Sequence, residues 1–388
     1  MKLQRTLQIQ VENCLSKYPI LAITGPRQSG KTTFLRNTFV NYQYINLENP
    51  DIRSFALEDP NGFLKQYDNH VIFDEIQRAP NLFSYLQSLV DENQVMGQFI
   101  LSGSQNFQLM ENISQSLAGR VAIFKLFPFD FQELKQAGWL KADLASQLYS
   151  GCYPAIYDRD IEPAQYFSNY LSTYVRRDIM NLQNIQDFDA FNRLIKICAN
   201  HAGQMVNYNK FSKMVGVSHT TIRQWISLLK TSYILFEIPP YYKNFNKRLV
   251  KSPKLYFYDT GLLCRLLEVK PNQLNPLYSN WGAIFENLCI AEIIKQNAHH
   301  NFLNDFYFWR DSNGHEVDLL FKDANFTYLI EIKASKTIKI DMFKNLNFLS
   351  DIMYNEPNKK LLIYGGDENQ KRSHYDILSW KNLDIKRM

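Results

Sequence analysis

A glycine-rich segment at residues 25–32, with the sequence GPRQSGKT, limits the N-terminal part of this chain to one kind of fold. The apolar run Ile20–Thr24 precedes this segment and reads as a buried strand, and Thr33 lies in a stretch typical of a helix. A strand, a glycine loop and a helix start in this order are the setting of a phosphate-binding loop. The backbone N–H groups of such a loop and the positive end of the helix bind phosphate oxygens. We therefore expect ATP with Mg²⁺ to bind here.

The residue types around this loop suggest individual roles. Lys31 is expected to reach the β- and γ-phosphates, and the hydroxyl of Thr32 is expected to hold Mg²⁺. A second apolar run, at residues 70–73, ends in Asp74 and Glu75. Asp74 is expected to bind Mg²⁺ through water, and Glu75 to polarise the water that attacks the γ-phosphate.

A third apolar run, Gln98–Leu101, is followed by Ser104, which we expect to face the γ-phosphate. Gln105 is the alternative, and either residue could be only a turn residue. The residues predicted to bind the nucleotide are Gly25, Pro26, Arg27, Gln28, Ser29, Gly30, Lys31, Thr32, Thr33, Asp74 and Ser104.

The chain of 388 residues is too long for one compact core, so we expect two or three domains. None of its five cysteines forms a CxxC pair, which argues against a disulfide framework or a zinc ribbon. No apolar run reaches the roughly 18 residues of a membrane span, and the N-terminus lacks the apolar core of a signal peptide. These features predict a cytoplasmic protein. The net charge of +5 permits nucleic-acid binding but does not argue for it.

The middle of the chain has the pattern of a winged helix. Residues 209–214 fit a short helix, Ser218 is a plausible N-cap, and residues 220–229 fit a second helix that precedes a strand at 233–236. The residues of this pattern expected to face DNA are Thr221, Arg223 and Gln224. The alternative is a structural lid or a module for protein contact. The following basic stretch, which ends near Lys254, is expected to contact phosphates or to serve as a linker, and its residues predicted to bind nucleic acid are Lys247, Arg248 and Lys251.

In the last third of the chain, Glu286, Asp318, Glu331 and Lys333 follow one another in an order that resembles that of PD-(D/E)xK nucleases. A helix from Trp281 carries Glu286, and strands are expected at 306–310, 316–321 and 327–333. Because side chains alternate along a strand, Glu331 and Lys333 point to the same side, where Asp318 of the adjacent strand meets them. The three acids Glu286, Asp318 and Glu331 are the expected ligands of Mg²⁺, with Mn²⁺ as an alternative ion, and Lys333 is expected to orient the nucleophile or to stabilise the transition state. No proline precedes Asp318, which departs from the usual motif.

Four strings, GPRQSGKTTFLR, VIFDEIQRAPNLFSYLQSLVDE, FILSGSQNF and SLAGRVAIFKLFPFDFQEL, together resemble the prokaryotic AAA+-type ATPases that carry a DUF4143 C-terminal region. The resemblance covers essentially the whole chain. It implies that Arg120 belongs to an arginine motif that senses or stabilises the γ-phosphate, in its own subunit or in a neighbour. The alternative is a surface arginine held by an acidic neighbour. The chain departs from the family's GGYPA turn at Cys152, where the second glycine would stand.

The expected fold class is α/β, with a P-loop AAA+-type ATPase domain at 1–145, a helical lid and winged-helix domain at 146–250, and a PD-(D/E)xK nuclease-like domain at 251–388. The expected function is ATP binding and hydrolysis combined with DNA binding and metal-dependent DNA cleavage. The expected catalytic residues are Lys31, Glu75, Arg120, Asp318, Glu331 and Lys333. The alternative is an ATP-driven switch or remodelling ATPase that binds DNA or protein without cleavage. A homo-oligomer is a further possibility, and no membrane partner is expected.

Overall fold

The computed structural model describes residues 3–104, 113, 115–179, 185, 187–241 and 252–388. These residues form two compact units. The first comprises residues 1–137 and 298–301, and the second comprises residues 138–297 and 302–388. Among the helices that the structure describes, none combines the length and the apolar composition needed to cross a bilayer.

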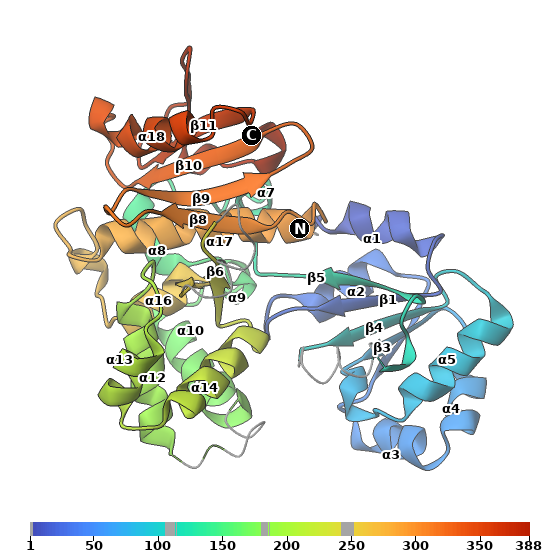
Figure 1. Cartoon of the computed structure of the whole chain (residues 1–388). Helices are drawn as coiled ribbons and strands as arrows, with labels where there is room; N and C mark the ends of the chain where they lie inside the picture. The colour runs from blue at the N-terminus through green and yellow to red at the C-terminus, as the bar shows by residue number, and fades with distance from the viewer. Residues whose placement is uncertain (1–2, 105–112, 114, 180–184, 186, 242–251) are drawn as a thin grey trace. The chain divides into compact units, whose positions relative to one another are not determined.

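The first unit is built on a five-stranded sheet, shown in Figure 1. All of its neighbouring strands pair in parallel, in the order β2-β3-β4-β1-β5. The strands are β1 (Ile20–Thr24), β2 (Gln43–Asn46), β3 (Val71–Asp74), β4 (Phe99–Gly103) and β5 (Val121–Lys125). Thr24 lies opposite Gly103, and Asp74 lies opposite Ser102. The carboxyl ends of β1, β3 and β4 therefore meet at one edge of the sheet.

Helices pack on both faces of this sheet. The helices of the first unit are α1 (Gln8–Leu15), α2 (Lys31–Thr38), α3 (Pro50–Glu58), α4 (Pro60–Gln66), the short η1 (Ile76–Arg78), α5 (Leu82–Asn93) and α7 (Phe131–Gln136). Successive residues of β1 alternate between two cores: Ile20 packs with apolar residues of α3, α4 and α5, and Leu21 packs with those of α1 and α2. Successive side chains of a strand point to opposite faces of the sheet, and helices cover both faces here, so each face of β1 contributes to its own core.

The second unit begins with helices. They are α8 (Leu144–Ser150), α9 (Pro154–Asp158), α10 (Pro163–Tyr170), the π-helical segment η2 (Leu171–Ile179), α12 (Phe188–Asn200), α13 (Tyr208–Val215), α14 (His219–Thr231), α16 (Thr260–Leu266), η3 (Pro271–Gln273) and α17 (Trp281–His299), whose last two residues fall in the first unit. Gly216 ends α13 in the left-handed conformation, and the Ser218 hydroxyl accepts from the backbone N–H of Thr221 and so caps α14. Strands β6 (Leu235–Ile238) and β7 (Lys254–Phe257) pair antiparallel.

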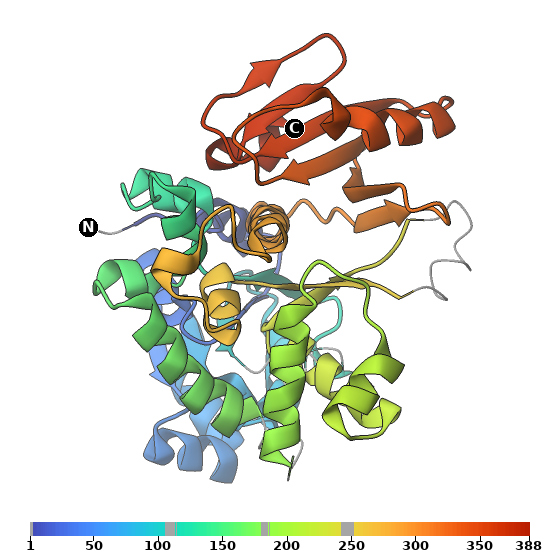
Figure 2. The same ribbon diagram turned by 90° about the vertical axis from the view of Figure 1, so that its left-hand side faces the viewer.

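A six-stranded sheet completes the second unit, in the order β12-β13-β11-β10-β9-β8. Its elements are β8 (Phe306–Arg310), β9 (Glu316–Lys322), β10 (Thr327–Lys333), η4 (Ile340–Phe343), α18 (Lys344–Ile352), β11 (Asn358–Tyr364), β12 (Gln370–Lys371), β13 (Asp376–Ser379), η5 (Trp380–Asn382) and η6 (Ile385–Arg387). Leu346 and Leu349 of α18 pack on Leu320 of β9 and Leu329 of β10, so α18 covers one face of the sheet (Figure 2).

Most expected elements are present, with shifted ends. The strands predicted at 20–24, 306–310 and 327–333 have the predicted bounds. The strand predicted at 233–236 instead begins at Leu235, because Tyr233 adopts the left-handed conformation after α14. Strands β12 and β13 were not predicted from the sequence.

Candidate functional site

The glycine loop between β1 and α2 has the backbone shape of a phosphate-binding loop. Gly25 has φ 147°, and a Cβ atom at this position would lie 2.2 Å from the carbonyl oxygen of Leu126, so only glycine fits. Gly30 has φ 93° and stands directly before α2. Nη1 of the buried Arg5 guanidinium donates to the Ser29 carbonyl oxygen at 3.0 Å and so holds the loop in place. Gln28, with φ 62°, is a third residue of the loop in the left-handed region.

Lys31 is buried and folds back onto the loop. Its Nζ donates to the carbonyl oxygens of Gly25 and Pro26, each at 2.9 Å. Burial lowers the pKa of Lys31 to about 8, against the opposing effect of Glu75 and Asp74. A buried ammonium whose pKa is depressed in this way gains most from an added anionic partner. The position is therefore suited to a phosphate.

Two oxygens suited to Mg²⁺ lie together beside this loop. The Thr32 hydroxyl donates to Asp74 Oδ2 at 2.9 Å, and the phenol of Tyr44 donates to the same oxygen. Hydroxyl and carboxylate oxygens are the ligands that Mg²⁺ takes in phosphate-binding loops. Tyr44 could not be selected from the sequence, because its place beside β3 depends on the pairing of β2 with β3.

Glu75 stands directly after β3 with φ 56° and ψ 40°, a conformation that is uncommon for residues other than glycine. Its carboxylate oxygen Oε2 accepts a hydrogen bond from Gln77 and a second from the buried Ser104 hydroxyl at 3.3 Å. Ser104 and Glu75 thus lie together at the carboxyl edge of the sheet. Gln105 lies outside the described residues.

Arg27 and Thr33 complete the predicted set. Arg27 Nη2 lies 3.9 Å from Glu48 Oε1, and Arg78 Nη2 lies 3.6 Å from the same oxygen. Thr33 is an exposed residue in the first turn of α2. The structure therefore brings together, around one loop, the residues predicted for the nucleotide, and places two further charged side chains beside Arg27.

Arg120 lies elsewhere on the first unit. Its carbonyl oxygen accepts from the N–H of Ile20, the first residue of β1, so Arg120 stands at the amino edge of the sheet. The glycine loop follows the opposite end of β1. The guanidinium forms a two-fold pair with the exposed Asp91, with Nε–Oδ1 at 2.5 Å and Nη2–Oδ2 at 2.7 Å. Arg120 does not lie beside the glycine loop of its own chain, and its pair with Asp91 matches the alternative expected from the sequence, a surface arginine held by an acidic neighbour.

A buried polar cluster joins the end of β5 to residues 298–301. Among the described residues, Asp130, Glu133 and His299 form the group of candidate metal ligands whose atoms all lie within 4.8 Å of one another. Glu133 Oε1 accepts from Arg5 Nε at 2.8 Å, and Asp130 Oδ2 lies 2.8 Å from His299 Nδ1. The Phe127 N–H donates to His299 Nε2 at 3.1 Å. Because these atoms already have partners, the cluster is structural.

The second unit brings Asp318, Glu331 and Lys333 together. Lys333 Nζ lies 2.5 Å from Glu331 Oε1 and 3.8 Å from Asp318 Oδ2, and the Ile332 N–H donates to Asp318 Oδ2 at 2.8 Å. Glu331 is only 3% exposed, and its second oxygen, Oε2, has no partner. Burial and the neighbouring Asp318 raise the pKa of Glu331 to about 8. The site is thus a buried acidic group that favours an added cation.

Glu286, on α17, belongs to the same group but has further partners. Its Oε1 accepts from the Tyr256 phenol at 2.6 Å and lies 3.2 Å from Lys254 Nζ. Burial and Asp318 raise its pKa to about 7. Lys254 also lies 2.5 Å from Glu316 Oε1. The sequence pattern did not indicate Lys254 or Tyr256 as part of this site, although the alternation along β7 puts both on one face.

The residues predicted to read DNA lie on α14. Arg223 and Gln224 are exposed and Thr221 is half-buried, whereas Ile222 and Trp225 are buried. The Arg223 guanidinium lies 4.8 Å from the centroid of the Tyr208 ring. The exposed and buried positions on α14 thus agree with the expected amphipathic helix. The residues of the basic stretch, Lys247, Arg248 and Lys251, lie outside the described residues.

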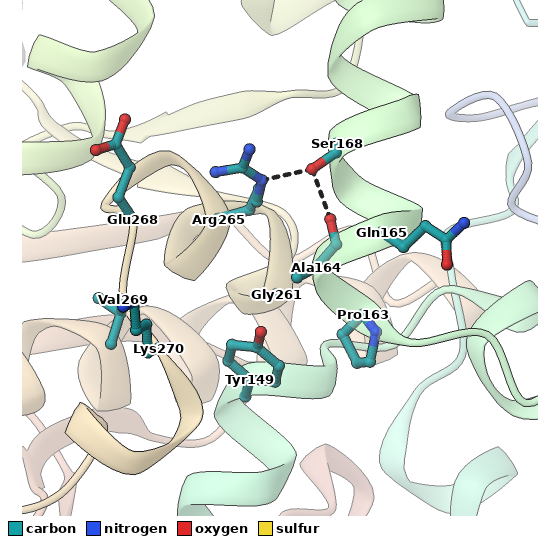
Figure 3. A pocket seen from close by; sticks show the side chains of 10 residues that line it. All are labelled: Tyr149, Pro163, Ala164, Gln165, Ser168, Gly261, Arg265, Glu268, Val269 and Lys270. Atoms are coloured by element: carbon teal, nitrogen blue, oxygen red, sulfur yellow. Dashed lines mark hydrogen bonds between the residues drawn. The ribbon is translucent and has the colours of Figure 1, made fainter.

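The second unit also has a cavity of about 530 Å³, which no predicted residue lines. Figure 3 shows Ser168 of α10 between Arg265 of α16 and the backbone of Ala164. The Arg265 Nε donates to the Ser168 hydroxyl at 2.7 Å, and that hydroxyl donates to the Ala164 carbonyl oxygen at 2.7 Å. The first of these bonds joins α16 to α10, and the second lies within α10.

Three family models match the chain in succession. Residues 17–135 match an AAA domain, residues 141–273 match the domain of unknown function DUF8612, and residues 281–383 match the domain of unknown function DUF4143. The chain therefore combines an AAA-type ATPase domain, a domain of the class that binds and hydrolyses ATP, with a DUF4143 region. The AAA match contains the glycine loop and the ends of β3 and β4 described above.

Several whole proteins are similar to this chain. An uncharacterized protein of Mycobacterium tuberculosis is 28% identical over 344 residues, which cover 87% of this chain and 75% of that protein. An uncharacterized protein of Haemophilus influenzae is 22% identical over 382 residues, covering 89% of each. Among solved structures, a Walker-type ATPase of Pyrococcus abyssi matches with a TM-score of 0.44 and 14% identity, covering 67% of this chain and 94% of that one.

Proposed function

We propose that this protein is an ATP-regulated DNA-processing enzyme whose second unit cleaves the phosphodiester backbone with a divalent metal ion. The observation that carries the proposal is the meeting of Asp318, Glu331 and Lys333, with a buried and unpartnered oxygen on Glu331. A buried carboxylate oxygen without a partner is costly, and a divalent cation supplies the missing partner. Acidic groups with raised pKa values in one cluster are also a feature of functional sites.

In the ATPase site, the contacts support the roles that we propose for individual residues. Lys31 exchanges its bonds with the loop carbonyls for the β- and γ-phosphates, and Thr32 with Asp74 holds Mg²⁺. Glu75 is the base that polarises the attacking water, and Ser104 orients its carboxylate. Arg120 acts on the nucleotide of a neighbouring subunit in a homo-oligomer, since it stands at the other edge of its own sheet.

In the nuclease-like site, Asp318 and Glu331 would hold a divalent cation, Mg²⁺ or Mn²⁺, while Glu286, the third predicted acid, stays paired with Lys254 and Tyr256. Such an ion, when bound, lowers the pKa of water and neutralises charge on the scissile phosphate. The Lys333 side chain is 39% exposed, so its ammonium can contact an incoming phosphate oxygen while it holds Glu331. Cleavage adds one water across a P–O bond, leaving a phosphate on one strand end and a hydroxyl on the other.

The pair of helices α13 and α14 supplies DNA contacts in this proposal, as part of a winged helix with β6 and β7. The N-terminal part of α14 carries Thr221, Arg223 and Gln224, and its opposite face is buried. A helix that follows a short turn and exposes polar side chains in its first turns has the form of a recognition helix. Phosphate contacts would come from the basic stretch that holds Lys247, Arg248 and Lys251.

The test is cleavage of mixed single- and double-stranded DNA with Mg²⁺ or Mn²⁺, with and without ATP. We expect wild type to cut and Lys333→Ala and Glu331→Gln to lose cutting. The matched control is Lys336→Ala, which removes an exposed lysine three residues further along. Cutting that depends on ATP and is lost in Glu75→Gln would establish the regulation.

Cutting that persists in Lys333→Ala would contradict the proposed site, because it would point to a contaminating nuclease. No cutting by wild type with either ion would favour the second candidate function. That candidate is an ATP-driven switch whose second unit binds DNA or protein without cleavage. The observation in its favour is Lys254, whose ammonium already supplies a positive charge between Glu286 and Glu316.

A further inference from the structure

We propose that Lys254 is a built-in cation of the nuclease-like site. Its ammonium takes the place that a second divalent ion would need, so that the site holds one divalent ion, at Asp318 and Glu331. This inference rests on the proposed function, since it concerns the metal ion of the same site. It assigns to Lys254 a positioning role that the sequence pattern does not suggest.

Lys254 begins β7, and its side chain is only 3% exposed. Its Nζ lies 3.2 Å from Glu286 Oε1 on α17 and 2.5 Å from Glu316 Oε1 on β9. The ring of Phe308 lies beneath the ammonium, with its centroid 5.5 Å away. A buried ammonium must be paired, and here two carboxylates from separate elements pair with it.

The acids of this site are thereby divided between the Lys254 ammonium and the proposed divalent ion. Glu286 Oε1 is occupied by Lys254 and the Tyr256 phenol, and Glu316 is occupied by Lys254 and Arg310. Among the described acids of this site, the one with a buried oxygen that lacks a partner is Glu331, at Oε2. Two-metal sites need a second cation roughly 4 Å from the first, within reach of shared carboxylates. Beside Glu286, the Lys254 ammonium already supplies this second positive charge.

The strand that carries Lys254 also connects the nuclease-like site to the helix predicted to read DNA. The strand β7 pairs with β6, and β6 follows α14, the helix predicted to read DNA. A bridge between Pro240 and Phe308 joins the chain beyond β6 to the six-stranded sheet. Lys254 therefore fixes the acids of the nuclease-like site from the same two-stranded sheet that supports α14.

The experiment counts Mn²⁺ bound by the full chain without nucleotide, by titration calorimetry and by the electron paramagnetic resonance signal of free Mn²⁺. Wild type is compared with Lys254→Met, which keeps the length of the side chain and removes its charge, and with Lys254→Arg, which keeps the charge. Glu331→Gln identifies the ions that belong to this site. We expect wild type and Lys254→Arg to bind one Mn²⁺ at this site and Lys254→Met to bind two. Glu331→Gln should bind no Mn²⁺ at this site.

Binding of two ions by wild type, or unchanged stoichiometry and affinity in Lys254→Met, would overturn the role of Lys254 while leaving metal-dependent cleavage intact. Absence of Glu331-dependent Mn²⁺ binding in every variant would overturn the proposed function itself and this inference with it. A calorimetric unfolding transition that ATP does not raise shows that the second unit of each variant, which contains residue 254, is folded. If Lys254→Met does not fold, Lys254→Gln in the same titration, with the same expected gain of one ion, decides the question.

Discussion

The phenol of Tyr44 donates a hydrogen bond to Asp74 Oδ2, the oxygen that also accepts from the Thr32 hydroxyl. Tyr44 lies on β2 and Asp74 at the end of β3, and the pairing of these two strands sets the contact. The Arg36 guanidinium lies 4.0 Å from the centroid of the Tyr44 ring and restricts its position. Tyr44 thus orients the carboxylate that is proposed to hold Mg²⁺.

Tyr44→Phe removes this donor and leaves the ring in place. A hydrogen bond to a charged group contributes about 1.5–3 kcal/mol, and water compensates part of it at a half-buried site. We therefore expect the Mg²⁺ concentration for half-maximal ATP hydrolysis to rise about tenfold, with a smaller change in the maximal rate. The control is Tyr42→Phe, whose phenol donates to the Gly97 carbonyl oxygen at 2.6 Å. Equal Mg²⁺ dependence of wild type and Tyr44→Phe would contradict this role.

Glu75→Gln removes the proposed base without removing its hydrogen-bond partners, Gln77 and Ser104. We expect ATP affinity to stay within about twofold and turnover to fall by about 10²–10⁴, the usual contribution of a positioned base. Equilibrium binding of a fluorescent ATP analogue and phosphate release measure the two quantities. The control is Glu48→Gln, an exposed acid beside Arg27 and Arg78. Turnover retained in Glu75→Gln would remove Glu75 as the base.

Local signals in the sequence predicted the glycine loop and the strands around it. The run Ile20–Thr24 is short, apolar and bounded by a proline and a glycine, so its type and ends are clear. The alternation in Thr327–Lys333 likewise placed Glu331 and Lys333 on one side of a strand. These signals depend on neighbours in the chain, which a single sequence contains.

Contacts between distant segments could not be predicted in this way. From the sequence, Lys254 was interpreted as part of a basic stretch. Nothing near it in the chain indicates that its buried ammonium pairs with Glu286 and Glu316. Arg120 was predicted to sense or stabilise the γ-phosphate. Only the register of β1 with β5 shows that it lies at the amino edge of the five-stranded sheet.

Arg120→Ala tests whether this residue acts on a neighbouring subunit. Because Arg120 is paired with Asp91 and lies away from the loop of its own chain, we expect ATP affinity to be unchanged. We expect turnover to fall only at protein concentrations at which subunits associate, as judged by size-exclusion chromatography. Mixing Arg120→Ala with Lys31→Ala should then restore activity, since one subunit supplies the nucleotide and the other the arginine. Loss of turnover in a dilute monomer would contradict a role between subunits.

The buried pair of Asp130 and His299 makes the stability of the first unit depend on pH. Burial alone would raise the pKa of Asp130, but the hydrogen bond and charge of His299 and the backbone N–H of Glu133 outweigh burial and hold the pKa well below its usual range. The folded state therefore binds fewer protons at this carboxyl than the unfolded state does. The resulting stability is present above the unfolded pKa of about 3.9 and is lost as the pH falls towards the folded pKa.

Asp130→Asn breaks this buried pair. We expect the free energy of unfolding of the first unit to fall by about 3 kcal/mol at pH 7, and the difference from wild type to shrink as the pH falls below about 4. Scanning calorimetry measures both effects, and the transition that ATP raises identifies the first unit. The control is Asp91→Asn, which breaks an exposed pair with Arg120 and should change the transition little. A difference between wild type and Asp130→Asn that stays constant from pH 7 to 3 would mean that the Asp130 carboxylate charge contributes nothing to stability.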